Sequence, residues 1–428
     1  MRTKSSLHTA IKSAVFSRQT SASFPLFAAL IFLITLGDAI IAYTVPVFLE
    51  SALHNTFMVG LVMSASSMAG LIYDLLASER MPNKPYAYFV KMTVLFAVLL
   101  PITLIFLPPF KIFVLLAMIF WGIYYETKIF AEFHFIDKHV PKSDYAKSWG
   151  LISVNNSLAY LLGPLIATFI IVYSLKLSLS ASLIFFVGAY IVFLFLNSRT
   201  KKKHEQVKEP ESENDRHSFL RTMRVWATLM GKVWPLWLFT LAATLVDASF
   251  WSVGVLFAEE LKATDPVGGF LLTAYMIPPV FMGFAIPKIS AKFGKKRTSF
   301  VSALVASALI SLFGFLNGVY LLLILVFISS VFLSLATPAL YAAYEDYVSR
   351  LGKFRNDMIG LEQSAVSIGY IIGPPLAGGL AVSLGAHKAF ATIGLILLII
   401  SIMCLLVVPR KIKMPQKELI ETAGAESM

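Results

Sequence analysis

Charged residues and cysteines are scarce in this sequence. Asp, Glu, Lys and Arg make up 14% of its 428 residues, whereas they make up about a quarter of ordinary soluble domains. Hydrophobic residues make up 57%, so the composition excludes an ordinary soluble protein. Cys404 is the single cysteine, which excludes an intramolecular disulfide and a thiol-rich metal site.

Two motifs of common cofactor and metal sites are also missing. The chain has no Gly-x-x-x-x-Gly-Lys-Ser/Thr loop to hold phosphates, and its seven histidines form no His-x-x-x-His pair. We therefore expect no enzymatic activity, no cofactor and no bound metal, and we expect no ATP-driven step within this chain. The first apolar run is about 25 residues long, too long for the core of a cleavable signal peptide, so we expect it to remain a membrane span.

The apolar residues fall in blocks of about 20, the length of helix that crosses a bilayer core of about 30 Å. The sequence thus predicts an all-α integral membrane protein with twelve spans. They lie at 24–48, 57–77, 86–107, 111–136, 148–172, 179–197, 234–258, 267–289, 298–317, 320–347, 359–383 and 388–409.

The net charge of +12 follows the predicted topology. Basic residues gather before the first span, after the last and in alternate loops, including the cluster at 199–203. By the positive-inside rule, both termini and the long middle loop are predicted to be cytoplasmic. The expected partner of these cations is the anionic lipid surface, not nucleic acid.

Two stretches of the chain repeat about half a chain apart, inside apolar runs. Thr35-Leu36-Gly37-Asp38-Ala39 returns 209 residues later as Thr244-Leu245-Val246-Asp247-Ala248. A second pattern returns 210 residues later: Gly150-Leu151, Ser157, Tyr160, Gly163-Pro164 and Ala167 match Gly360-Leu361, Ser367, Tyr370, Gly373-Pro374 and Ala377. In a hydrophobic chain, repeats of this length indicate two similar membrane halves.

The predicted organisation follows from the spans and the repeats. It comprises a cytoplasmic N-terminal segment (1–23), a six-helix bundle (24–197), a cytoplasmic linker with an amphipathic helix (198–233), a second six-helix bundle (234–409) and a cytoplasmic tail (410–428). The linker helix is predicted from apolar and basic residues mixed over 219–229, a pattern typical of helices on a membrane surface.

Twelve spans in two duplicated halves, with a long central loop, resemble the major facilitator superfamily of secondary transporters. That superfamily's loop between spans 2 and 3 usually reads Gly-x-x-x-Asp-Arg/Lys-x-Gly-Arg/Lys-Arg/Lys. The second half is similar at 287–296, with Pro for the first Gly and Ala291 for the Asp; the first half keeps Gly70 and Asp74 but lacks the basic ending. Span 359–383 resembles the glycine motif of antiporters.

The resemblance implies two pseudo-symmetric bundles that rock about a central site, with hinge and gate residues in these motifs. The implied hinge residues are Gly163, Pro164, Gly369, Gly373, Pro374 and Gly378. The implied cytoplasmic gate residues are Gly70, Asp74, Lys292, Gly294, Lys295, Lys296, Glu345 and Asp346. For the last two, a solvated helix end is the alternative.

Asp38 and Asp247 are the principal functional candidates. Each lies about 13 or 14 residues into its span, where insertion of a carboxylate costs about 2.5–3.5 kcal/mol. Such residues commonly mark proton or substrate pathways, although each could instead hydrogen-bond a neighbouring helix and fix packing. Glu126 is a third candidate for proton coupling or substrate binding.

The other acidic groups in the spans have simpler interpretations. Lys128 and Glu132 are four residues apart and are expected to neutralise each other on one helix face. Glu362 opens the eleventh span and is expected at the membrane interface. The candidate cavity aromatics are Tyr43, Tyr124, Trp251 and Tyr275, and Tyr125, Tyr160 and Tyr370 also carry a polar tip at membrane depth.

These features predict a transporter that works by alternating access, as a monomer in the plasma (inner) membrane. Proton-coupled efflux of amphipathic or cationic compounds is favoured, since an aromatic, acid-bearing cavity suits hydrophobic cations. Uptake of a sugar or other metabolite, proton-coupled or facilitative, is the first alternative. A receptor or assembly protein with a transporter fold, moving nothing itself, is the second.

Overall fold

The computed structural model describes residues 23–80, 84–108, 110–141, 144–201, 219–282, 285–409, 415–416 and 418–419. Every regular element within these ranges is a helix. Residues 1–22 of the predicted N-terminal segment, residues 202–218 of the linker and most of the tail lie outside the described residues, so their expected positions stay predictions.

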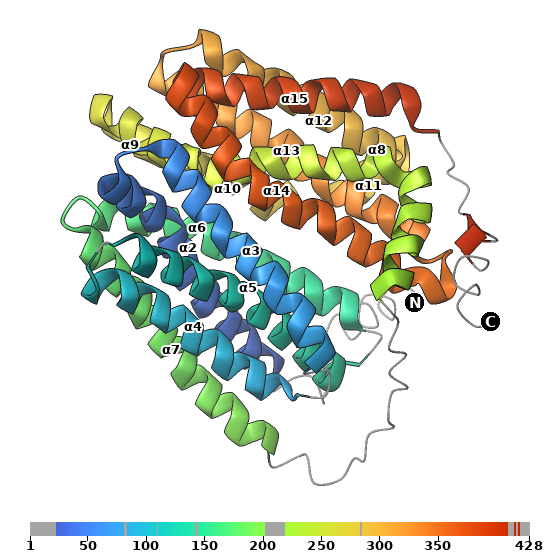
Figure 1. Cartoon of the computed structure of the whole chain (residues 1–428), viewed down its shortest axis with the longest axis horizontal. Helices are drawn as coiled ribbons and strands as arrows, with labels where there is room; N and C mark the ends of the chain where they lie inside the picture. The colour runs from blue at the N-terminus through green and yellow to red at the C-terminus, as the bar shows by residue number, and fades with distance from the viewer. Residues whose placement is uncertain are drawn as a thin grey trace, which may run out of the picture. The chain divides into compact units, whose positions relative to one another are not determined.

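The helices of the first half match the six predicted spans in order (Figure 1). They are α2 (Phe24–Leu53), α3 (Thr56–Arg80), α4 (Tyr86–Phe106), α5 (Lys111–His139), α6 (Tyr145–Ile170) and α7 (Leu175–Lys201). All six contain a stretch long and apolar enough to cross a membrane.

The second half contains more helices, and several of them are short. Its helices are α8 (Phe219–Trp251), α9 (Val253–Thr264), η3 (Pro266–Phe270), α10 (Leu271–Met282), α11 (Ile286–Phe293), α12 (Lys295–Ser311), η4 (Leu312–Phe315), α13 (Val319–Val348), η5 (Gly352–Phe354), α14 (Arg355–Leu384) and α15 (Ala386–Val407). Five of these regions qualify as spans, which gives eleven among the described residues.

The described residues of the eighth predicted span, 267–289, form η3, α10 and α11, and residues 283–284 between α10 and α11 lie outside the described part. The apolar helical stretch described there is Pro266–Met282. Pro278 and Pro279 lie inside α10, and a proline cannot donate the helical hydrogen bond to the carbonyl four residues before it.

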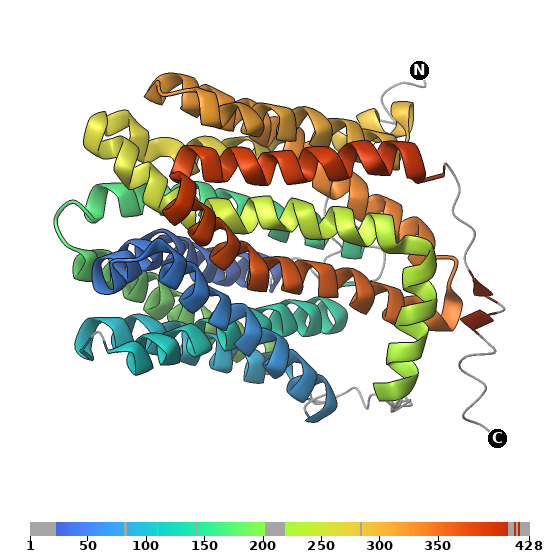
Figure 2. The same cartoon turned by 45° about the horizontal axis from the view of Figure 1, so that its top comes forward.

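The predicted amphipathic helix of the linker is helical, but it is continuous with the seventh span. α8 runs without interruption from Phe219 to Trp251 and contains Pro235. Figure 2 shows its first part lying at a steep angle to the rest. Ser252 then separates α8 from α9, so the predicted span 234–258 contains a break.

The chain divides into two compact units. The first contains residues 1–41 and 69–209, and the second contains residues 42–68 and 210–428. Within the first unit α4 packs against α5 and α7; within the second, α12 packs against α13 and α15 in the same way. Equivalent helices therefore pair equivalently, as the sequence repeat predicts.

The repeated Gly-Pro motifs mark a second equivalent pairing. A Cβ atom at Gly163 on α6 would lie 2.3 Å from the Cβ of Ala39 on α2. A Cβ atom at Gly373 on α14 would lie 2.7 Å from the Cβ of Ala248 on α8. Each glycine thus faces the alanine that directly follows a repeated Asp. The two helices can approach this closely because glycine has no side chain.

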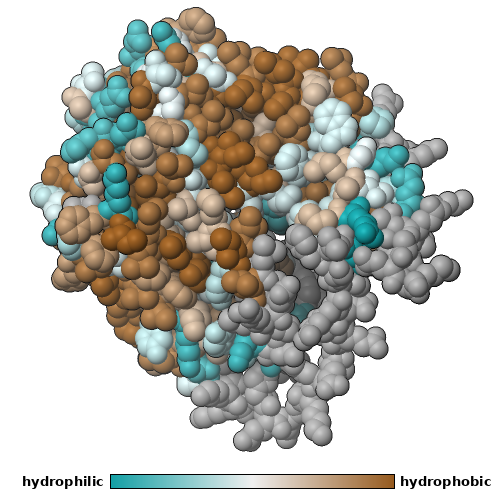
Figure 3. Space-filling model, in the orientation of Figure 1, coloured by the Kyte–Doolittle hydropathy of each residue, from teal (hydrophilic) through white to brown (hydrophobic). Residues whose placement is uncertain are grey.

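Exposed side chains along the helices are largely apolar. Phe106, Phe315 and Ile399 are 74%, 82% and 65% exposed, and Figure 3 shows broad hydrophobic areas on the visible face. A lipid-facing surface needs no polar groups, because lipid tails are as apolar as these side chains. The outward apolar residues agree with a membrane-embedded fold.

Gly163→Ala is expected to lower the apparent melting temperature of the detergent-purified protein. The new methyl group would overlap Ala39, and overpacking of this kind costs about 1–3 kcal/mol. Gly150→Ala is the matched control on the same helix, since a Cβ atom there meets nothing within 4 Å. Equal melting temperatures for the two variants would contradict the close crossing of α2 and α6.

Candidate functional site

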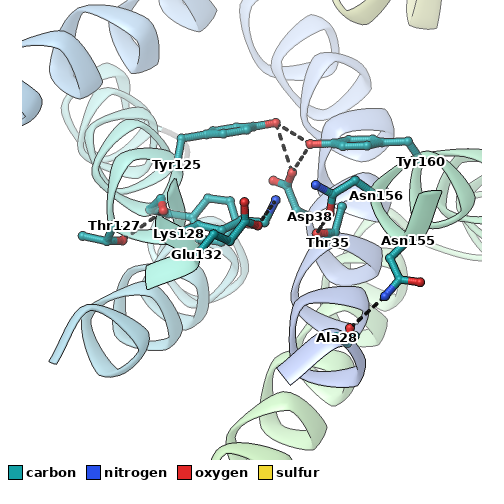
Figure 4. Close-up of polar contacts among 11 residues, drawn as sticks. Ala28, Thr35, Asp38, Tyr125, Thr127, Lys128, Glu132, Asn155, Asn156 and Tyr160 are labelled. Atoms are coloured by element: carbon teal, nitrogen blue, oxygen red, sulfur yellow. Dashed lines mark hydrogen bonds and ion pairs between the residues drawn. The ribbon is translucent and has the colours of Figure 1, made fainter. Parts of the chain in front are cut away.

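Asp38 lies near the middle of α2 and is enclosed by hydrogen-bond donors from α5 and α6. Trp121 Nε1 donates to Oδ1 at 2.8 Å, and the Tyr160 hydroxyl donates to Oδ2 at 2.6 Å. The Tyr125 hydroxyl lies 3.1 Å from Oδ2 and 2.7 Å from the Tyr160 hydroxyl. Figure 4 shows the two tyrosines converging on the carboxylate from different helices. With 1% of its surface exposed, Asp38 has neutral donors on both oxygens.

Asp247 on α8 has a simpler set of partners. The Tyr275 hydroxyl of α10 donates to Oδ1 at 2.7 Å, and the Tyr370 hydroxyl of α14 donates to Oδ2. The Tyr275 ring stacks on Phe250, with centroids 4.2 Å apart. Asp247 is half-buried rather than fully enclosed, so it is the more open of the two carboxylates.

Each of the two sites contains a tyrosine at an equivalent position of the repeat. Tyr160 and Tyr370 occupy equivalent positions in the 210-residue repeat, and each donates to the Oδ2 atom of its own Asp. Each tyrosine is three residues before the glycine that contacts the alanine beside that Asp. The duplicated motifs therefore encode one local arrangement, formed twice.

Prolines loosen the helices at these donors. Pro164, Pro279 and Pro374 each lie four residues after a tyrosine that donates to one of the two Asp carboxylates. Because proline has no N–H, the carbonyl of that tyrosine loses its usual helical donor. For Tyr275 the Ser330 hydroxyl supplies a replacement. Three of the four tyrosines that bind the two Asp carboxylates thus lie where proline makes their helices easier to bend, and Tyr125 is the exception.

A buried ion pair lies beside Asp38. Lys128 Nζ and Glu132 Oε1 are 3.4 Å apart, with side chains 8% and 7% exposed, and both appear in Figure 4. Lys128 is also close enough to Asp38 for their charges to interact. The predicted pairing along α5 is therefore present, and it adds a positive charge near Asp38.

Glu126 lies on the side of α5 that faces α3 and is not among the described hydrogen-bond partners of Asp38. It is half-buried on α5 and faces α3, where a Cβ atom at Gly70 would lie 3.2 Å from its Oε1. Asp74, one turn further along α3, is close enough to interact with it electrostatically. Gly70, predicted as a gate residue, thus lies against Glu126, a predicted coupling residue, in the first unit.

The four predicted cavity aromatics make different contacts in the structure. Tyr275 binds Asp247, whereas the Tyr43 hydroxyl donates to Glu259 Oε1 at 2.6 Å. Tyr124 is buried against Tyr125 and Phe186, and its hydroxyl has no hydrogen-bond partner among the residues that the structure describes. Trp251 is half-buried at the end of α8.

The predicted gate residues of the second half lie at the start of α12 and the end of α13. Lys295 Nζ is 2.6 Å from Asp346 Oδ1 and 3.1 Å from the Ala342 carbonyl. Gly294 has a φ of 85°, a conformation that residues with a side chain rarely adopt.

The remaining gate candidates make no described contact with a carboxylate. Lys292 Nζ lies 5.3 Å from the centre of the Phe293 ring, Lys296 donates to the Pro409 carbonyl, and Glu345 is exposed.

The predicted hinge glycines sit at close contacts. Besides Gly163 and Gly373, a Cβ atom at Gly369 would lie 2.7 Å from the Thr244 Cβ, and one at Gly378 would lie 2.4 Å from the Thr56 carbonyl oxygen. Their role as hinges stays a prediction, whereas the short distances show that they allow close packing of the helices.

Sequence reasoning missed two parts of the site. Trp121 was not selected, because nothing in its sequence context distinguishes it from other span aromatics. The break at Ser252, five residues after Asp247, was also missed, although Ser249 and Ser252 bond back to carbonyls of the preceding turn. Among the described residues, no three His, Cys, Asp or Glu side chains gather as metal ligands.

Comparisons with known proteins find a family match in the second half of the chain. Residues 236–425 match the family model "Major Facilitator Superfamily". Sugar efflux transporter C of Escherichia coli (strain K12) is 27% identical over 153 residues, which is 34% of this chain and 39% of that relative. The aligned part is therefore well under half of the relative's length.

Solved structures share the fold along nearly the whole chain. A bacterial homolog of the human lysosomal transporter Spinster, in an inward-facing and unoccupied conformation, has a TM-score of 0.69 at 13% identity, covering 95% of this chain and 99% of its own. The nucleoside transporter NupG has a TM-score of 0.70 at 11% identity, covering 90% and 98%. A POT family transporter in complex with 5-aminolevulinic acid has a TM-score of 0.69 at 12% identity, covering 90% and 96%.

At these identities the solved structures establish the fold, and the family model supplies the relationship in sequence. Residues 236–425 are thus similar in sequence to the Major Facilitator Superfamily, and the chain as a whole has the fold of these solved transporters.

Proposed function

We propose that this protein is a secondary transporter that exports a small organic molecule in exchange for protons, by alternating access of its two halves. The observation that carries the proposal is Asp247. This membrane-embedded carboxylate is hydrogen-bonded by two neutral tyrosines, and no ion pair joins it to a cation among the described residues.

A carboxylate in this setting is suited to reversible proton binding. Charge at membrane depth is costly, about 2.5–3.5 kcal/mol by insertion scales, and tyrosine hydroxyls offset only part of that cost. Binding of a proton or of a cationic substrate neutralises the negative charge of Asp247, and release of either restores that charge. Alternating access requires that binding change the relative free energies of the inward-open and outward-open conformations. The change in the charge of Asp247 provides such an effect.

The energy source follows from what the sequence contains. The chain carries no phosphate-binding loop, so a gradient across the membrane is the remaining source. Protons are favoured because Asp38, Asp247 and Glu126 all lie in apolar helices.

The favoured substrates are amphipathic or cationic compounds. Embedded acids surrounded by tyrosine and tryptophan rings favour them through charge and cation–π attraction. A sugar is the second candidate, because the curated relative is named for sugar efflux. Hydroxyl-rich substrates would use the same tyrosines as hydrogen-bond partners.

We place the protein in the plasma membrane as a monomer, with both termini cytoplasmic. The support for the orientation of the termini is the distribution of Lys and Arg in alternate loops. Cysteine-accessibility labelling of the loops is the direct test of this orientation.

Asp247→Asn is expected to reduce proton-driven efflux by about 10-fold or more. Asparagine keeps the size of the side chain but cannot gain or lose a proton, so the two transport states no longer differ in charge. The measurement is efflux of ethidium and, separately, of labelled sugars from proteoliposomes, with and without an imposed pH gradient. Asp38→Asn is tested in parallel.

Glu260→Gln is the control, since it makes the same carboxylate-to-amide change at an exposed position of α9. Unchanged gradient dependence in Asp247→Asn would rule out Asp247 as the coupling group. No efflux of either substrate class by the wild type, with protein confirmed in the membrane, would favour the non-transporting alternative.

Tyr370→Phe is expected to impair gradient-driven efflux more than Tyr160→Phe. Both changes remove one hydroxyl and keep the ring, and a hydrogen bond to a charged group contributes about 1.5–3 kcal/mol. Asp38 retains Trp121 and Tyr125, whereas Asp247 retains only Tyr275 among its described donors. Initial rates at several pH values compare the variants, and equal effects would contradict the unequal roles of the two carboxylates.

A further inference from the structure

Asn156 is a polar residue in the middle of a membrane helix, and its hydrogen-bonding groups are only partly used. It lies on α6 and is half-buried. The Thr35 hydroxyl on α2 donates to its Oδ1 at 2.9 Å. Its Nδ2 donates to no described residue and is not fully enclosed, so two N–H groups remain available. An amide at membrane depth costs free energy when its donors have no partner.

The amide lies beside the Asp38 site. Its partner Thr35 is three residues before Asp38 on α2. Tyr160, which donates to Asp38, is four residues after Asn156 on α6. Residues at these spacings share a helix face, so the two hydrogen bonds are successive contacts of one helix crossing. Figure 4 shows both α6 side chains reaching α2 near the carboxylate.

The second unit shows that this kind of crossing forms without an amide. Val366 occupies the position of Asn156 in the 210-residue repeat. At the equivalent crossing of α8 and α14, a Cβ atom at Gly373 would still lie only 2.7 Å from the Ala248 Cβ. The close approach of the two helices therefore does not require Asn156, which leaves its amide for another use.

Near this amide the charged groups are enclosed and the neutral groups are accessible. Asp38 is 1% exposed, and the side chains of the Lys128–Glu132 pair are 8% and 7% exposed. Tyr125 and Tyr160, like the amide, are half-buried. A ligand at this place would therefore meet neutral hydrogen-bonding groups and aromatic rings before it met a charge.

These groups fit a ligand that carries hydroxyl groups. An amide N–H donates to a hydroxyl oxygen, and a phenol can donate or accept. A few polar groups among aromatic rings are the usual means by which a site orients a small molecule. An organic cation would find no accessible anion here, because both oxygens of Asp38 already accept hydrogen bonds.

We propose that Asn156 is a substrate-recognition residue of the first unit and that its N–H groups bind a hydroxyl group of a neutral, polyhydroxylated ligand. The ligand is a free sugar or the sugar part of an amphipathic glycoside, and Tyr125 and Tyr160 lie beside it. Asp38 orients the two tyrosines and does not contact the ligand. This assignment rests on the transport function proposed above and names the substrate class of its first-unit site.

Equilibrium binding to the purified full-length protein tests the assignment without transport. The probes are labelled mono- and disaccharides, the p-nitrophenyl glycosides of the same sugars, and ethidium, which has no hydroxyl group. Asn156→Val copies the residue of the second half. It is expected to weaken binding of the hydroxylated probes about 3- to 10-fold, the factor that one neutral hydrogen bond contributes, and to leave ethidium binding unchanged. Binding of the glycosides alone would identify a glycoside, and binding of the free sugars as well would identify a sugar.

Asn155→Ala is the matched control. Asn155 is the neighbouring amide, donates to the Ala28 carbonyl on α2 at 3.1 Å and corresponds to Ala365 in the repeat. Its removal is expected to change the melting temperature but not the affinity for any probe. Asn156→Ser, which retains a small polar side chain, covers the case in which valine impairs folding and is expected to weaken the same probes.

Three results would overturn the proposal. They are no binding of any hydroxylated probe to the wild type, equal affinities in the wild type and both Asn156 variants, and an equal loss of affinity in Asn155→Ala.

Deoxy analogues of the tightest-binding sugar test direct contact. Removal of the hydroxyl group that Asn156 binds is expected to weaken wild-type binding about 3- to 10-fold. The same removal should have no further effect in Asn156→Val, because the hydrogen bond is already lost there. A residue that acts only through helix packing would leave the penalty of every analogue the same in both proteins, and that result would reject direct recognition.

These measurements separate the inference from the proposed function. Asn156-dependent sugar binding in a protein whose transport ignores the pH gradient would reject proton coupling and keep the recognition residue. Gradient-driven ethidium efflux that is lost in Asp247→Asn, without Asn156-dependent binding of any hydroxylated probe, would keep the proposed function and reject the inference.

Discussion

Two close helix crossings position the carboxylate sites. At each crossing a glycine of a Gly-Pro pair faces the alanine that follows an Asp, and its missing side chain lets the two helices approach. The tyrosine three residues earlier then reaches the carboxylate. If the helices stood further apart, each Asp would lose the hydrogen bond of this tyrosine, so the packing contact and this polar contact depend on each other.

The same arrangement has diverged between the two units. Asp38 also accepts hydrogen bonds from a tryptophan and a second tyrosine on α5, and a buried Lys128–Glu132 pair lies beside it. Asp247 has two tyrosines, is more open, and lies five residues before the break at Ser252. A fully enclosed carboxylate suits a structural role, whereas a partly open one next to a helix interruption suits a change of protonation during transport.

The sequence was sufficient for the parts of this fold that depend on periodic apolar length and on duplication. Eleven of the predicted spans match apolar helices, and the offsets of the repeats anticipated that Tyr160 and Tyr370 would be equivalent. Trp121 could not be selected, because its contact with Asp38 joins residues 83 positions apart. The burial of Glu362 also depends on tertiary packing, which hydropathy averages out.

One consequence concerns how this protein can be studied. Cys404, the single cysteine of the sequence, is fully buried on α15, and its thiol lies 3.3 Å from the Pro235 carbonyl. Water-soluble maleimides react with exposed thiolates, so the native chain should stay unlabelled while folded. A cysteine introduced at a loop or beside a carboxylate would then give a signal without background, and a fluorophore or spin label placed there would report on that position alone.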